Sequence, residues 1–173
     1  MPIQTRLRPL TPSTEELREY IALCNQIENA SEDEAGPLIA RWNARAGMEY
    51  TYPEFLSYYG AVSIETFVGE MLLGQPTYVP DLTYPELREV LCARLALELS
   101  DAVDSYFLGW LEVNLPGSNV SNLIYWPNIW FGDESINELS HDQILAYAMA
   151  RSGRCFPDAP ADVPMPYPLP AKS

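Results

Sequence analysis

The amino-acid sequence predicts an all-α fold, a compact helical bundle of about eight helices followed by a Pro-rich C-terminal tail. Helix-start signals recur along the chain, and apolar residues spaced three and four positions apart follow them. We find no convincing period-two alternation of the kind that a strand produces. Apolar residues make up 47% of the 173 residues, which is enough for a core and argues against wholesale disorder despite a net charge of −14.

The predicted helix starts are capping boxes, in which Ser or Thr is followed three residues later by Glu or Gln. In such a box, the hydroxyl and the carboxylate or amide satisfy backbone groups that the first turn leaves without partners. The boxes are Ser13–Glu16, Ser31–Glu34, Thr51–Glu54, Thr83–Glu86 and Ser140–Gln143.

Apolar stripes follow these starts and define the predicted core faces of the helices. The stripes are Leu17, Tyr20, Ile21, Cys24 and Ile27; Leu38, Ile39 and Trp42; Ile64, Phe67, Val68, Met71 and Leu72; Leu87, Val90 and Leu91; Val103, Tyr106, Phe107, Trp110 and Leu111; and Ile144, Leu145, Ala148 and Met149. Arg94 makes the fourth stripe less regular, because it occupies the next position of that face. A short apolar helix is predicted over 123–126, just before Pro127.

The pattern predicts one helical domain over 1–155, with a candidate internal repeat of 13–75 and 83–155. In both halves, the order is a long helix, a long helix, a short aromatic helix and a further helix. The alternative is that amphipathic helices with similar caps look alike, and the Thr-Tyr-Pro-Glu sequences at 51 and 83 fall out of register. Closely spaced prolines predict that the tail, 156–173, is extended or mobile.

The charge and the absence of long apolar runs limit the classes of partner. The 24 acidic residues outnumber the 10 basic ones, so the chain should repel nucleic acid and favour a basic protein partner. No apolar stretch is long enough for a membrane span, and the N-terminal sequence lacks a signal-peptide pattern, so we expect a cytoplasmic protein. Three widely spaced cysteines predict neither a disulfide framework nor a zinc site, and no cofactor is expected.

The sequence lacks the common catalytic motifs, so it predicts a non-enzymatic protein. His141 is the only histidine, and its neighbours Ser140 and Asp142 point in different directions on a helix turn, which excludes a triad from these residues alone. Many carboxylates lie in first turns, where they have a capping role. Cys24 is predicted to be a core thiol and Cys92 a similar one, which leaves Cys155 as the candidate reactive thiol.

The segment around residues 116–134 is the candidate partner-binding surface. Adjacent aromatics on a short helix that ends at proline cannot all pack inward, and a rigid exposed aromatic is a common interface anchor. The alternative is that Trp126, Trp130 and Phe131 fill a gap in the core beneath the loop. The candidate binding residues in this segment are Asn122, Tyr125, Trp126, Trp130, Asp133 and Glu134.

Residues 121–127 read Ser-Asn-Leu-Ile-Tyr-Trp-Pro, with a Pro-Gly pair before them and an acidic loop and a helix after them. This arrangement resembles the colicin/pyocin DNase immunity proteins, small acidic four-helix proteins whose third helix carries Ser-Asp-Leu-Ile-Tyr-Tyr-Pro. The resemblance covers 83–155. Asn122 replaces an acid of that family, Trp126 replaces a tyrosine, and the spacing before the motif is longer.

The resemblance implies a protein that binds beside a nuclease active site and excludes DNA by charge and bulk. It implies that Tyr125 and Trp126 are the anchors and that Asp101, Asp104 and Glu112 add specificity. We therefore expect an immunity or antitoxin-like protein that neutralises a bacterial toxin, such as a nuclease. The alternatives are an acidic DNA mimic, a small carboxylate-dependent enzyme and an adaptor that uses its Pro-rich tail.

Overall fold

The computed structural model describes residues 3–96 and 99–170, and these residues confirm the all-α prediction. They form nine α-helices and two short 3-10 helices, and no strand occurs among them. Within the same ranges, no helix is long and apolar enough to cross a membrane. The end of the predicted tail, 171–173, lies outside the described residues.

The contacts of the chain group into two compact units. The N-terminal unit comprises Pro9–Gln75 and Ser100–Tyr106, and the C-terminal unit comprises the described residues within Met1–Arg8, Pro76–Leu99 and Phe107–Ser173. The single domain over 1–155 and the internal repeat stay predictions.

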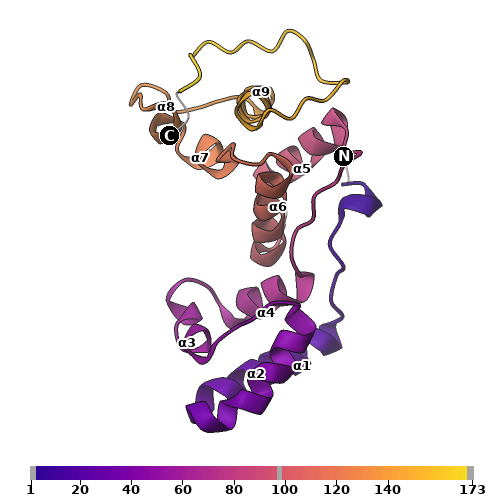
Figure 1. Ribbon diagram of the computed structural model, residues 1–173, viewed down its shortest axis with the longest axis vertical. Coiled ribbons are helices and arrows are strands. Elements are labelled where there is room, and N and C mark those ends of the chain that lie inside the picture. The colour runs from indigo at the N-terminus through magenta and orange to yellow at the C-terminus, as the bar shows by residue number, and fades with distance from the viewer. Residues whose placement is uncertain (1–2, 97–98, 171–173) are drawn as a thin grey trace. The chain divides into compact units, whose positions relative to one another are not determined.

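The N-terminal unit has an aromatic core. In this unit, α1 packs against both α2 and α4 (Figure 1). The Trp42 side chain is fully buried, and its ring centroid lies 5.0 Å from that of Phe55 and 5.5 Å from that of Phe67. The elements are α1 (Thr14–Asn29), α2 (Glu32–Ala46), α3 (Tyr52–Phe55), η2 (Tyr58–Gly60) and α4 (Ile64–Leu73).

The C-terminal unit packs α9 against both α5 and α7. Its core includes the predicted faces of α5 and α9, where Leu87, Leu91 and Leu145 are fully buried. The elements are η1 (Thr5–Leu7), α5 (Tyr84–Leu95), α7 (Val120–Tyr125), α8 (Pro127–Phe131) and α9 (His141–Ser152), with the later residues of α6 (Asp101–Asn114).

The helices begin where the capping boxes predict. The Ser13 hydroxyl accepts a hydrogen bond from the Glu16 backbone N–H at 3.0 Å, and α1 starts at the next residue. The other boxes close in both directions and precede α2, α3, α5 and α9. Much of the negative charge near helix starts therefore has a local structural role.

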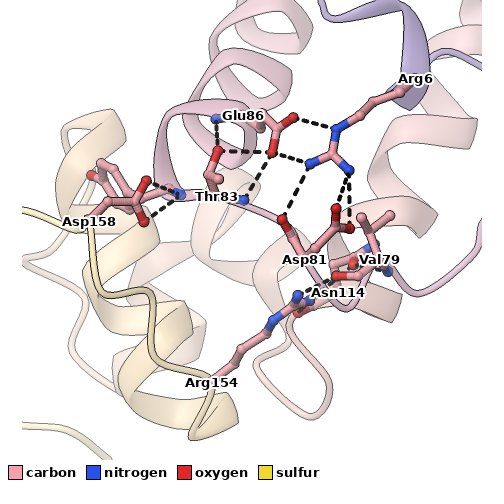
Figure 2. Close-up of polar contacts among 9 residues, drawn as sticks. Arg6, Val79, Asp81, Thr83, Glu86, Asn114, Arg154 and Asp158 are labelled. Atoms are coloured by element: carbon pink, nitrogen blue, oxygen red, sulfur yellow. Dashed lines mark hydrogen bonds and ion pairs between the residues drawn. The ribbon is translucent and has the colours of Figure 1, made fainter.

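The box before α5 carries an additional ion pair. The Arg6 guanidinium donates to both carboxylate oxygens of Glu86, at 2.7 and 2.6 Å, and also to Asp81 (Figure 2). The Glu86 side chain is only 3% exposed, and the Arg6 hydrogen bond lowers its pKa to about 2. The N-terminal segment is thereby fastened to the first turn of α5.

A second cation fastens the loop before α5 to the end of α6. The Arg154 guanidinium donates to the backbone carbonyl and the side-chain oxygen of Asn114, both at 3.0 Å, and to the Val79 carbonyl (Figure 2). The Asn114 oxygen also accepts from the Val79 N–H at 2.9 Å. Asn114 is fully buried and the two other residues are partly buried, and the cluster ties together three segments that are distant in the sequence.

The described part of the Pro-rich tail, 156–170, contains turns but no helix, and it lies along α9 (Figure 1). The buried Tyr147 hydroxyl donates to the Tyr167 carbonyl at 2.9 Å and accepts from the Tyr167 N–H at 2.8 Å. Nearer the start of the tail, the Asp158 carboxylate accepts from the Tyr84 N–H at 3.2 Å. The tail is therefore held by hydrogen bonds at both ends.

Candidate functional site

The segment that sequence reasoning selected folds into two short helices, α7 and α8, joined at Trp126. Trp126 has φ −141° and ψ 63°, which ends α7, and Pro127 then supplies the first residue of α8. Proline suits this position, because the first helical N–H has no partner in any case. A short helix precedes Pro127 as predicted, but it covers Val120–Tyr125 rather than 123–126, because the chain leaves the helix at Trp126; α8 was not predicted.

The two short helices leave an apolar surface exposed. Tyr125 is 48% exposed, Trp126 is 53% exposed and Ile129 is 63% exposed. The buried residues Val120 and Leu123 occupy the opposite face of α7. We call the three exposed residues the aromatic surface. Its two rings have centroids 5.5 Å apart and are tilted by 52°.

A buried arginine orients the Tyr125 ring. Arg94 on α5 is only 3% exposed, its guanidinium carbon lies 5.2 Å from the Tyr125 ring centroid, and it donates a hydrogen bond to the Tyr125 hydroxyl. The cation and the ring therefore attract each other across a partly buried contact. Sequence reasoning missed this role, although a cation on the apolar stripe of α5 was a signal that it has a buried partner.

Trp130 differs from the other predicted anchors, because its side chain is only 6% exposed, and its role in partner binding stays a prediction. Its indole N–H donates to the Ser118 carbonyl at 2.8 Å, and Arg151 lies 4.8 Å from its ring centroid. Trp130 follows Pro127 by three positions, so both residues lie on the buried face of α8. The burial of this ring agrees with the alternative weighed from the sequence, in which Trp130 fills a gap in the core.

The predicted polar residues of the C-terminal unit surround this segment with hydrogen bonds. Glu112 accepts from the Ser121 N–H at 2.9 Å and so caps α7, and Glu134 accepts from the Asn128 amide at 3.2 Å. Asp133 accepts from the side chain and the backbone of Ser135, which lowers its pKa.

The remaining predicted binding residues, Asn122, Asp101 and Asp104, do not all lie in the same unit. Asn122 is partly exposed, and its carbonyl accepts from the Trp126 N–H at 2.8 Å. Asp101 and Asp104 belong to the N-terminal unit, at the start of α6, so they are not counted with the aromatic surface.

The N-terminal unit contains an open hollow of about 540 Å³ that two acids line. These are Glu70 and Asp101, and the other lining residues include Ser63, Thr66 and Ser105. A cleft with two acids is what the carboxylate-enzyme alternative requires. Within the described ranges, no group of three or more His, Cys, Asp or Glu side chains is placed to hold a metal ion.

Comparisons with models of protein families, with curated proteins and with solved structures give no match to this chain. The likeness to immunity proteins therefore rests on the motif at 121–127 and on the helix order.

Proposed function

We propose that the chain is a non-catalytic, acidic protein of the immunity or antitoxin type, which binds and neutralises a basic toxin such as a nuclease. The observation that carries this proposal is the aromatic surface. About half of each of the Tyr125 and Trp126 side chains remains accessible at the junction of two short helices.

The contacts of the aromatic surface suit a partner-binding role. Large rings bury much area on binding, and a ring already held in place loses little conformational entropy. Arg94 holds the Tyr125 ring from beneath, and the chain geometry at Pro127 fixes the position of Trp126. These are the properties of interface residues that contribute most to binding free energy.

The charge near the surface favours a basic partner. Asp133 and Glu134 are exposed directly after α8, and the whole chain carries a net charge of −14. Such a field accelerates association with a positively charged protein and weakens as salt screens it. A nuclease fits this description, because its DNA-binding surface must be basic.

The carboxylate-enzyme alternative retains one specific observation, the hollow lined by Glu70 and Asp101. The binding experiment described below distinguishes this alternative from the proposed function, because a carboxylate-dependent enzyme would not need the aromatic surface. The DNA-mimic alternative predicts a partner that nucleic acid displaces. The adaptor alternative requires the tail to detach from α9, where Tyr147 holds it.

The test is affinity capture from the lysate of the native cell, followed by purification of the captured protein and an assay of its toxic or nuclease activity. We expect a basic protein whose activity falls on binding and whose association slows several-fold as salt rises. Trp126→Ala should weaken binding by at least tenfold, which is about 1.4 kcal/mol. The double variant with Tyr125→Ala should abolish capture.

The matched control is Tyr59→Ala, which removes an aromatic side chain that is 73% exposed in the N-terminal unit. This variant should bind as the wild type does, and circular dichroism should show equal helix content in all variants. Equal binding by the Trp126→Ala variant would refute the aromatic surface as the binding site. A captured protein that keeps its full activity in the complex would refute neutralisation.

A further inference from the structure

Cys92 and His141 form a thiol–imidazole pair in the C-terminal unit. Cys92 lies on α5 and His141 is the first residue of α9, so the two are far apart in the sequence. The Cys92 sulfur lies 3.2 Å from Nδ1 of the His141 ring, within hydrogen-bond distance for sulfur. Both side chains are partly exposed, so small solutes can reach the pair.

Neighbouring contacts hold the first turn of α9 against α5. The Asp142 carboxylate accepts from the Tyr84 hydroxyl at 2.9 Å and from Nε of Arg88 at 2.6 Å. Both donors lie on α5, one to two turns before Cys92. The side chain that follows His141 is thus fixed to the helix that carries Cys92, and the pair is part of a packed helix contact.

The arrangement suits proton transfer from the thiol to the imidazole. A thiolate is the nucleophilic form of cysteine, and a neutral imidazole nitrogen is an effective base. Arg88 places a positive charge nearby, because its hydrogen bond to the Asp142 carboxylate raises the pKa of Arg88 and keeps it protonated. The group of opposite sign facing the pair is the Asp142 carboxylate, which Arg88 neutralises. The Tyr84 phenol, which donates to Asp142, carries no charge, because burial raises its pKa to about 12.

We propose that Cys92 is a modification site, a thiol that peroxides oxidise after His141 accepts its proton. The thiolate sulfur attacks one peroxide oxygen, an S–O bond forms and the O–O bond breaks. Sulfur loses two electrons to the peroxide and becomes a sulfenic acid. The departing hydroxide takes the proton from the His141 imidazolium and leaves as water when the oxidant is hydrogen peroxide.

The other two cysteines provide internal comparisons. Cys24 is fully buried, and burial raises the pKa of its thiol to about 12, so it should be inert. Cys155 is exposed, yet it has no histidine partner, because the chain's only histidine is the one that contacts Cys92. If exposure alone decided the rate of oxidation, Cys155 would react fastest. If contact with a base decides it, Cys92 reacts fastest.

The test treats the full chain with hydrogen peroxide and dimedone at pH 7 and measures the label on each cysteine by mass spectrometry. An ordinary thiol is only a few per cent ionised at this pH, so a base in contact gives a gain of about tenfold. We expect Cys92 to be labelled about tenfold faster than Cys155 and Cys24 not to be labelled in the same time. In urea, the labelling rates of the three cysteines should converge.

Substitution of the base separates proton transfer from a structural role. His141→Gln should bring the Cys92 rate down to that of Cys155 or below and leave the Cys155 rate unchanged. Imidazole in the buffer should restore part of the Cys92 rate in His141→Ala. Faster labelling of Cys155 in the native wild type, an unchanged Cys92 rate in His141→Gln, or no restoration by imidazole would each overturn the proposal.

Discussion

The ion pair between Arg6 and Glu86 allows a quantitative prediction for Glu86→Gln. Glutamine at this position keeps the capping box, as Gln143 does at the start of α9, but it loses the charge that Arg6 binds. The pKa of Glu86 falls from 4.5 to about 2 in the folded chain. At about 1.4 kcal/mol per pKa unit, the upper limit of its contribution is about 3 kcal/mol. Because Arg6 is 41% exposed, solvent screens the pair, and we expect about 2 kcal/mol.

The pH dependence of this contribution has a definite sign. A carboxylate whose pKa is lowered on folding stabilises the folded chain above its unfolded pKa, and this stabilisation is lost as the pH falls through the folded value. The wild type should therefore exceed Glu86→Gln in stability at pH 7 and at pH 5. The difference should shrink towards zero at about pH 2.

Urea unfolding followed by tryptophan fluorescence measures the difference. Three of the four tryptophans, Trp110, Trp126 and Trp130, lie in the C-terminal unit with Glu86. The control is Glu34→Gln, which alters the exposed box of α2 and should cost clearly less than Glu86→Gln, because no cation pairs with the box in the described structure and solvent screens it. The reasoning fails if both variants lose the same stability at pH 7, or if the Glu86→Gln difference persists at pH 2.

Further substitutions test the packing around each unit by urea unfolding and limited proteolysis. Trp130→Ala should cost about 3–5 kcal/mol because the ring is buried, whereas the exposed Trp126→Ala should cost less than about 1 kcal/mol; equal costs would contradict the assignment of the two rings. Tyr147→Phe removes the hydroxyl that makes two hydrogen bonds to the Tyr167 backbone, so the free energy of unfolding should fall by about 1–2 kcal/mol. The tail should also become more sensitive to proteases, and unchanged cleavage would argue against the contact. Gly69→Ala should destabilise the N-terminal unit by about 1–3 kcal/mol, because the new Cβ atom would lie 2.9 Å from a Cβ atom of α6, and a neutral effect would show that this contact yields easily.

The helix starts were predictable because capping is a local interaction. Each box needs only residues within one turn, so the sequence specifies where α5 begins. The partner of Glu86 was not predictable, because Arg6 lies 80 residues away and nothing local to α5 indicates it. The pairing of Cys92 with His141, 49 residues apart, has the same cause: only tertiary packing brings them together.

The aromatic segment shows where periodicity loses its predictive value. A single helical phase cannot be followed through Pro127, because the chain leaves the helix at Trp126 and starts a new one. The new helical phase buries Trp130 and exposes Ile129. Extending the residue spacing of α7 past Pro127 would not predict which of these two side chains is buried. The exposure of Tyr125 and the burial of Leu123 follow from the phase of α7 itself, and these were accessible to sequence reasoning.

The order of elements agrees with the predicted halves: two long helices, a short segment and a further helix occur in each. The short segments also share a pattern, since Phe55 and Leu123 are buried while Tyr59 and Trp126 are exposed. Similar helices with similar caps could produce this order without duplication, so common packing does not imply common function.

The Tyr59→Ala control tests whether the two halves share a binding function, because equivalent halves would both contribute to partner binding. We expect only the C-terminal aromatic surface to bind the proposed partner, since Tyr59 has no counterpart of the Tyr125 and Arg94 contact among its ring interactions in the described structure. Loss of binding by Tyr59→Ala at unchanged helix content would contradict this and assign a second binding surface to the N-terminal unit.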